Sequence, residues 1–204
     1  ATVLRFVTRL GFDGYPAFQR RLREEIQERI ASPLTLYGSR SAPIDDADVL
    51  ASGRRVFVDA LEATFANLPP AEFHAAVDLL ADKRLRISCT GGRLSQILAV
   101  YLGAHLQALR ANTRVLGDGL MPRVDHLVDL GQRDVLVVFD YRRYQTDTID
   151  FARRAQERGA AIVLFTDPWL SPVAGFARHV LPTSIIAPSP FDSLAPAMAA
   201  VETL

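Results

Sequence analysis

Apolar positions follow a helical period in the first part of the chain and a mixed period after it. Helical spacing runs through residues 2–10 and again from Pro16 to Ile30. It returns in residues 46–68 and in residues 71–83. Residues 32–45 are rich in Ser, Pro and Gly, which predicts a linker between these two helical parts.

From residue 84 onward, the pattern becomes strand, turn and helix in repeated order. The strongest strand is 134–140, because every residue from Val135 to Phe139 is apolar, as in a strand buried on both faces. Strands that alternate with helices predict an α/β fold with a doubly wound parallel sheet of about five strands. The predicted strands are 85–90, 113–118, 134–140, 160–167 and 180–185, and the predicted helices are 94–110, 124–130, 146–159, 171–179 and 191–204.

Ligands of such a sheet bind at the carboxyl ends of the strands, near the switch in strand order. Three turns are expected at that edge: 90–95, 140–146 and 167–172. Arginine forks there suit a phosphate or a carboxylate, and the N–H groups that open helix 94–110 add partial positive charge. The candidate ligand-binding residues are Gly91, Gly92, Arg93, Ser95, Asp140, Arg142, Arg143, Gln145 and, from the closing helix, Ser193.

Two other interpretations of these turns stay open. Asp140 could neutralise Arg93 or Arg142 and leave no place for a ligand, or some of the arginines could serve a subunit interface, where Arg and Tyr are enriched. Helix capping is the alternative role for the other polar residues of these turns. The candidate caps are Asp167, Ser171, Asp192 and Ser193.

Residues 2–10 also contain candidate functional residues. Thr2, Arg5, Thr8 and Arg9 share one polar face of the predicted helix, and we expect the opposite face to point toward a core. That core face carries Val3, Phe6, Val7 and Leu10. Arg reads guanine, and Thr or Arg can hold phosphates, so the polar face is a candidate DNA contact. The alternative is the surface of an ordinary helical bundle.

The distribution of charge adds to the functional interpretation only at the N-terminal end of the chain. The 204 residues are 49% hydrophobic and 23% charged with no net charge, which excludes a uniformly basic nucleic-acid binder. Residues 1–23 nevertheless carry five arginines against one acid, which suits a module that contacts phosphates. An arginine-rich composition explains the bias equally well, since Lys83 is the sole lysine.

The chain shows no signal-peptide pattern and no apolar run near the roughly 20 residues that span a bilayer. Its single cysteine, Cys89, excludes an intrachain disulfide, and we expect a cytoplasmic location without membrane contact. The first residue is Ala1, within a helical pattern, so we expect upstream residues in the natural protein.

Catalytic chemistry finds little support in the sequence. An aldose–ketose isomerase needs a base beside the substrate carbon, commonly Glu or His, and glutamates are scarce near the three turns. The four histidines are scattered without metal-ligand spacing, and His105 is expected to be a packed or surface residue of a helix. Cys89 is expected in the core. We therefore predict no catalytic residue, no metal site and no cofactor.

The first 18 residues closely resemble the end of the helix-turn-helix domain of the MurR/RpiR transcriptional regulators. That family places Ser-x-Ala-Thr-[Val/Ile]-x-Arg-Phe in its recognition helix, followed by Leu-Gly-[Phe/Tyr]-x-Gly-[Tyr/Phe]-x-x-[Phe/Leu]. The matching residues are Ala1, Thr2, Val3, Arg5, Phe6, Leu10, Gly11, Phe12, Gly14, Tyr15 and Phe18. The resemblance implies a truncated DNA-binding domain over residues 1–31.

Residues 84–204 are similar to a sugar isomerase (SIS) domain. The similarity lies in the glycine turn at 91–92 with Ser95, in 134–146, and in "ERGAAIVLFTD", "SPVAGFA" and "FDSLAPAMAAVETL". It implies an SIS domain over 46–204, leading helices included. SIS domains bind phosphosugars, which in these regulators control operator binding.

Both ligand turns depart from the SIS pattern. Arg93 stands at the second glycine of Gly-x-Gly-x-Ser. Residues 140–145, Asp-Tyr-Arg-Arg-Tyr-Gln, replace Ser-x-Ser-Gly-x-Thr, so its serines, glycine and threonine are absent.

The favoured hypothesis is a transcriptional regulator that binds operator DNA as a homodimer or homotetramer and senses a small anionic effector, such as a sugar phosphate. The alternatives are a sugar-phosphate isomerase or other SIS enzyme, and a regulator whose SIS domain only oligomerises.

Overall fold

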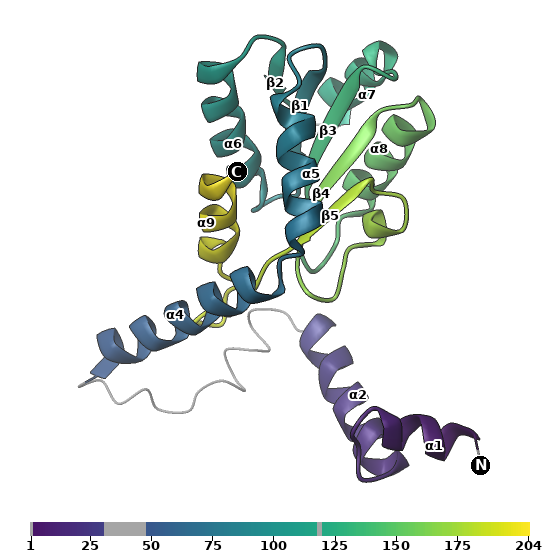
Figure 1. Ribbon diagram of the computed structural model, residues 1–204, viewed down its shortest axis with the longest axis vertical. Coiled ribbons are helices and arrows are strands. Elements are labelled where there is room, and N and C mark those ends of the chain that lie inside the picture. The colour runs from purple at the N-terminus through teal and green to yellow at the C-terminus, as the bar shows by residue number, and fades with distance from the viewer. Residues whose placement is uncertain (1, 31–47, 118–119) are drawn as a thin grey trace. The chain divides into compact units, whose positions relative to one another are not determined.

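A computed structural model describes residues 2–30, 48–117 and 120–204 (Figure 1). The chain divides into two compact units, residues 1–40 and 41–204, and each is treated by itself. The predicted linker, 32–45, lies outside the described residues. The domain boundaries suggested by the sequence stay a prediction.

The first unit contains two helices, α1 (Thr2–Arg9) and α2 (Tyr15–Ile30). Both agree with the helical periods of the sequence. The turn between them contains Gly11 and Gly14, whose φ angles of 85° and 132° lie in the region that favours glycine. The ring of Phe12 packs edge-on against Phe18 in α2, with ring centroids 5.5 Å apart.

The expected core face of α1 is only partly buried within its unit. Val7 is fully buried, but Phe6 is 58% exposed and Leu10 is 51% exposed. Of the four residues expected on this face, Val7 is confirmed as buried, the expectation is wrong within this unit for Phe6 and Leu10, and the side chain of Val3 lies outside the described residues. One neighbouring helix offers too little surface to cover a whole apolar stripe.

The second unit is built on a sheet of five parallel strands in the order β2-β1-β3-β4-β5. The predicted α/β fold with a parallel sheet is confirmed. The strands are β1 (Arg86–Gly91), β2 (Thr113–Val115), β3 (Asp134–Phe139), β4 (Ala161–Thr166) and β5 (His179–Pro182). The helices are α4 (Val49–Asn67), α5 (Pro70–Ala81), α6 (Gln96–Leu109), α7 (Leu120–Asp129), α8 (Thr146–Glu157), α9 (Ala195–Thr203) and the 3-10 turn η2 (Pro172–Gly175).

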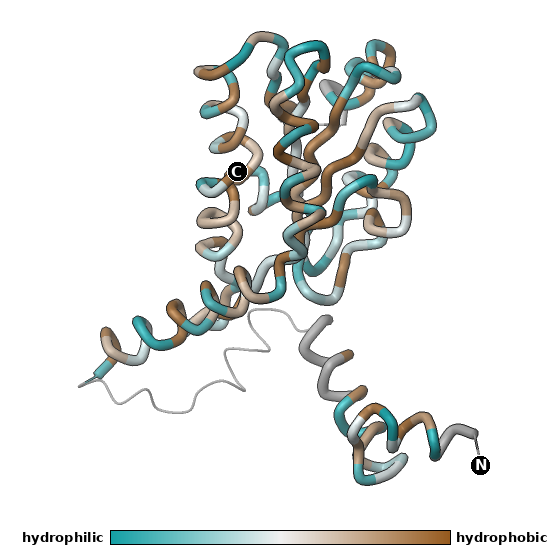
Figure 2. The backbone as a smooth tube through the Cα atoms, in the orientation of Figure 1, coloured by the Kyte–Doolittle hydropathy of each residue, from teal (hydrophilic) through white to brown (hydrophobic). Residues whose placement is uncertain are grey.

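The sheet lies between two layers of helices, as Figure 1 shows. Alternate residues of each central strand face opposite sides, so the continuous apolar runs of β3 and β4 supply both cores. One core joins Val137 and Phe139 to α5, α6 and α9, and the other joins Leu136 and Val138 to α7 and α8. Figure 2 shows these strands as apolar segments between helices of mixed hydropathy. None of the described helices is both long enough and apolar enough to cross a membrane.

The strand order places a switch point between β1 and β3. The chain leaves β1 for β2 on one side and then returns to β3 on the other side of β1. Gly91 pairs with Phe139 at the carboxyl ends of these two strands. The turns 91–95 and 140–145 therefore leave the sheet next to each other, at the position where doubly wound sheets bind ligands.

Three predicted elements are shorter in the structure. The strand at 113–118 contains only Thr113–Val115. The helix expected at 171–179 is reduced to η2, because His179 pairs with Val163 in the sheet. The closing helix begins at Ala195 rather than at 191.

Two glycines offer a matched test of the packing between α6 and β2. A Cβ on Gly103 would lie 2.2 Å from Val115 Cγ2, whereas a Cβ on Gly53 in α4 would meet no atom within 4 Å. Val is stiff at χ1, so Gly103→Ala should lower the free energy of unfolding by about 1–3 kcal/mol through overpacking. Gly53→Ala should raise it by up to about 1 kcal/mol through helix propensity. Urea unfolding of both variants measures the difference, and equal effects would contradict the packing.

Candidate functional site

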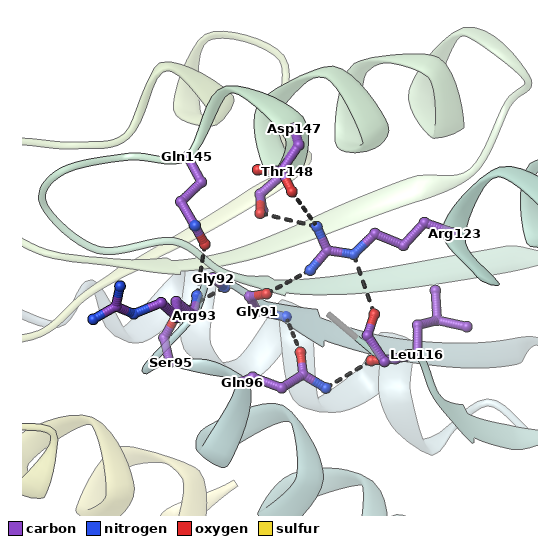
Figure 3. Close-up of polar contacts among 11 residues, drawn as sticks. Gly91, Gly92, Arg93, Ser95, Gln96, Leu116, Arg123, Gln145, Asp147 and Thr148 are labelled. Atoms are coloured by element: carbon purple, nitrogen blue, oxygen red, sulfur yellow. Dashed lines mark hydrogen bonds and ion pairs between the residues drawn. The ribbon is translucent and has the colours of Figure 1, made fainter. Parts of the chain in front are cut away.

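The turn after β1 is held by hydrogen bonds from its own side chains (Figure 3). Gly91 N donates to Gln96 Oε1 at 2.8 Å, and Gly92 N donates to Ser95 Oγ at 2.9 Å. The Ser95 hydroxyl in turn donates to the carbonyl of Phe139 at 2.6 Å, which fastens the turn to the end of β3. Ser95 is buried, and its hydroxyl is used within the chain.

Both glycines of this turn lie close to other atoms, Gly91 to backbone and Gly92 to the end of a side chain. A Cβ on Gly91 would lie 2.7 Å from the backbone of Ser95 and Gln96, where α6 begins. A Cβ on Gly92 would lie 2.8 Å from Gln145 Oε1. The turn is therefore packed tightly against the helix on one side and against Gln145 on the other.

Arg93 contacts the second turn through its backbone. Its N–H donates to Gln145 Oε1 at 2.6 Å, and Gln145 comes directly before α8. Its guanidinium is exposed and forms no ion pair within the described part of the chain. It borders a groove of about 520 Å³ along α6, lined mainly by apolar side chains that include Ile97 and Val100.

Arg123 is a site residue that sequence reasoning missed. It lies on α7, and its side chain is only 2% exposed. Its Nη2 donates to the carbonyl of Gly91 at 2.7 Å, and its Nη1 donates to Thr148 Oγ1 at 3.2 Å and to Asp147 Oδ2 at 3.4 Å (Figure 3). Its Nε donates to the carbonyl of Gly117 at 3.3 Å, and the counter-charge of this buried guanidinium is Asp147, whose side chain is 46% exposed. The signal in the sequence was its helical spacing with Leu127.

Asp140 follows β3 directly and is buried. Its carboxylate accepts a short 2.5 Å hydrogen bond from the hydroxyl of Ser171. Burial raises the pKa of Asp140 to about 6, and the hydrogen bonds from Ser171 and from the backbone N–H of Gln145 offset part of that rise. Ser171 also accepts from Val173 N and caps η2, which confirms its expected capping role.

Asp192, rather than Asp140, neutralises Arg142. Arg142 Nη2 lies 2.5 Å from Asp192 Oδ1, and its Nε donates to Asp192 Oδ2 at 2.9 Å. Arg143 Nη2 approaches the same carboxylate at 3.4 Å. The alternative in which Asp140 pairs with Arg142 is wrong, because Ser171 already holds the Asp140 carboxylate. Asp192 was one of two candidate caps of the closing helix, with Ser193 as the other.

Further contacts fasten the second turn to its surroundings. Tyr144 donates its hydroxyl hydrogen to Asp167 Oδ1 at 2.7 Å, and the hydroxyls of Tyr141 and Thr183 lie 2.8 Å apart. Asp167 Oδ1 also accepts from Trp169 N at 3.0 Å. The backbone of this loop is thus fixed at several points.

Two predicted ligand-binding residues are Arg143 in the second turn and Ser193 in the closing segment, and both take part in the local geometry of the chain. Arg143 has a φ of 70°, a left-handed conformation that costs energy for a residue with a side chain. Ser193 Oγ accepts from Ala195 N at the start of α9, at 3.1 Å, which fits the capping alternative.

Two candidate nucleophiles lie away from these turns. His126 Nε2 lies 2.8 Å from Ser88 Oγ, and Arg114 donates to His126 Nδ1 at 3.2 Å. Since Arg can only donate, Nε2 carries the hydrogen and this neutral His126 cannot take a proton from Ser88. Cys89 is buried in the core as expected, and burial raises the pKa of its thiol to about 12.

The polar face of α1 is accessible at three of its four candidate positions. Arg5, Thr8 and Arg9 are exposed. Thr2 is the first residue of α1, and its side chain is not among those that the structure describes. The DNA contact suggested for this face stays a prediction.

The sheet order and the glycine turn at the switch point, whose N–H groups donate to oxygen atoms, are those of an SIS-type fold. The SIS domain family matches residues 79–204, and the chain belongs to this family.

One curated relative is a transcriptional regulator. The chain is 24% identical over 182 residues to an uncharacterised HTH-type transcriptional regulator of Haemophilus influenzae, which covers 89% of the chain and 62% of that relative. The chain thus spans less than two thirds of that protein's length.

Two solved structures are similar. The sugar isomerase domain of an RpiR transcription factor from Sphaerobacter thermophilus has a TM-score of 0.68 at 29% identity, over 73% of this chain and 84% of that one. The Vibrio vulnificus NanR protein complexed with ManNAc-6P has a TM-score of 0.63 at 19% identity, over 99% of this chain and 71% of that one, which shows a shared fold.

The ion pair between Arg142 and Asp192 can be tested by removing one charge. The Arg142 side chain is 3% exposed, so Asp192→Asn leaves a buried guanidinium without its carboxylate and should cost about 3 kcal/mol of unfolding free energy. Arg143→Gln should cost less than about 0.5 kcal/mol, because Arg143 is 42% exposed. Chemical denaturation of both variants measures the two costs. Equal costs would contradict the assigned pairing.

Proposed function

We propose that the chain is part of a DNA-binding transcriptional regulator whose SIS domain senses a small anionic, phosphosugar-like effector. The relationship to an HTH-type regulator and to an RpiR transcription factor supports the regulatory role. The observation that carries the effector site is the hydrogen bond from Arg93 N to Gln145 Oε1, in which an N–H group at the switch point donates to an oxygen atom from another loop.

The chemistry of the first turn supports an anionic ligand. The N–H groups before α6 carry partial positive charge, and the buried guanidinium of Arg123 bonds the carbonyl of Gly91 next to them. The guanidinium of Arg93 is exposed beside the same turn. A phosphate is the small group that best matches several N–H donors and a nearby guanidinium. The NanR structure, which holds ManNAc-6P on the same fold, supports the same class of effector.

The DNA-binding part of the proposal rests on α1. Its exposed Arg5 and Arg9 lie four residues apart and can reach one groove or two neighbouring phosphates. Operator half-sites are read by symmetric proteins, so the proposal includes a homodimer or homotetramer. Exposed apolar side chains along α6, Ile97 at 58% and Val100 at 50%, support contact between two copies. A cytoplasmic location belongs to the same proposal.

An isomerase is the second candidate, and Asp140 is the observation in its favour. A carboxyl group with a pKa of about 6 is suited to act as a base at neutral pH. However, Asp140 is 1% exposed, and Ser171 occupies its carboxylate. A sugar carbon cannot approach it without rearrangement of both loops, so the regulator is the better-supported function. Turnover of sugar phosphates by the chain would reverse this preference.

DNA binding by the full-length protein can be tested with paired arginine variants. Fluorescence anisotropy should show salt-dependent preference for the DNA upstream of its own gene over random DNA. Arg5→Ala should weaken that specific binding by about tenfold or more, because it removes a base or phosphate contact. Arg20→Ala, an exposed arginine of α2 with the same charge change, should have a smaller effect. Equal binding to both DNAs would refute the regulator.

The effector part is tested in the same assay with ManNAc-6P, other sugar phosphates, phosphorylated acids and simple carboxylates. A true effector should change the affinity for operator DNA by at least about fivefold. If none of them changes either DNA affinity or melting temperature, the SIS domain serves oligomerisation alone.

A further inference from the structure

The side chain of Gln145 occupies the ligand edge of the first turn. It extends from the start of α8 to the backbone of Gly92 and Arg93, as Figure 3 shows. Its Oε1 accepts from Arg93 N at 2.6 Å and would lie 2.8 Å from a Cβ on Gly92. The carboxamide oxygen therefore fills the space above Gly92 and uses the N–H of Arg93.

The acceptor of Arg93 N is a side chain of the other loop, whereas the side-chain acceptors of the two N–H groups before it belong to the turn and to α6. Gly91 N donates to Gln96 Oε1 and Gly92 N donates to Ser95 Oγ, and Gly92 N also donates to the backbone carbonyl of Phe139 at 3.0 Å. Arg93 N is bonded by a residue 52 positions away, on a different loop. Removing that one side chain would expose an N–H donor without unfolding the turn.

The electrostatics of the turn are left incomplete by this arrangement. Gln145 supplies a neutral dipole, whereas the buried guanidinium of Arg123, which donates to the carbonyl of Gly91, is paired at 3.4 Å with the half-exposed carboxylate of Asp147. A buried charge is stabilised best by a full counter-charge at short range. An oxyanion in place of the carboxamide would bring negative charge to this turn.

The carboxamide can leave while its backbone stays in place. The backbone N–H of Gln145 bonds the Asp140 carboxylate, and its carbonyl accepts from Ile149 N at 3.0 Å within α8. The preceding Tyr144 is fixed by its bond to Asp167. The Gln145 side chain is half-buried, so rotation about its own χ angles carries the oxygen away from Arg93.

We propose that the Gln145 carboxamide is an intramolecular occupant of the effector site that an anionic ligand must displace. The proposal rests on the anion-sensing function above and adds a specificity device to it. A simple anion gains the Arg93 N–H only by breaking an existing hydrogen bond. A ligand with further groups to contact, such as the rest of a phosphosugar, can offset that loss. Gln145 thus selects against inorganic phosphate and sets the threshold for the effector.

The test is isothermal titration calorimetry of the full chain with inorganic phosphate, at constant ionic strength maintained with chloride. Gln145→Ala should bind phosphate about tenfold more tightly than the wild type, because one competing hydrogen bond is gone. Gln145→Glu keeps the length and places a negative charge at the turn, so it should bind phosphate at least about tenfold more weakly. Gln156→Ala removes an exposed glutamine of the same helix and should match the wild type. Circular dichroism checks that all variants are folded.

The outcomes separate this inference from the proposed function. Tighter binding by Gln145→Ala with weaker binding by Gln145→Glu supports displacement. Where wild-type binding is too weak to measure, measurable binding by Gln145→Ala without measurable binding by Gln145→Glu supports it. If the wild type binds phosphate and Gln145→Ala binds it equally well or more weakly, the inference is overturned and anion sensing stays intact. Absence of phosphate and sugar-phosphate binding in every variant overturns the inference together with the anion-sensing function.

Discussion

The parallel pairing of β1 with β3 is the constraint on which the site depends. These strands lie at the centre of the sheet between two apolar cores, and their register sets Gly91 opposite Phe139. The hydroxyl of Ser95 then bonds the carbonyl of Phe139, so that the first turn and the end of β3 form one unit. The chain reverses its direction of travel across the sheet at this point. Two loops from different halves of the domain consequently face each other, which is the geometry that ligand sites of doubly wound sheets use.

The fold was predictable because burial leaves a strong pattern. The unbroken apolar run from Val135 to Phe139 fits a strand covered on both faces, and strands that alternate with helices indicate a parallel sheet. The position of the candidate site followed from the same rule. Short elements were less predictable: β2 retains three residues, and sheet pairing of His179 ends the helix expected before β5.

The partners of the site residues could not be predicted from the sequence. Arg142 meets Asp192 across 50 positions, and Gly91 meets Arg123 across 32. Such pairs depend on the path of loops, which neither periodicity nor turn chemistry fixes. Charge alone suggested that Asp140 could neutralise an arginine, yet the closeness of the Ser171 hydroxyl decides its partner. The second turn thus lacks the serines of the SIS pattern, and its own side chains occupy the space there.

The central claim is that the chain supplies its own ligand to the turn after β1, through Gln145. The most direct measurement is the chemical shift of the Arg93 backbone amide proton in the wild type and in Gln145→Ala. A hydrogen bond of 2.6 Å moves this proton strongly downfield, so the account predicts a clear upfield change in the variant and recovery of the downfield shift when a bound anion replaces the carboxamide. An Arg93 amide shift that is the same in both proteins would contradict the account.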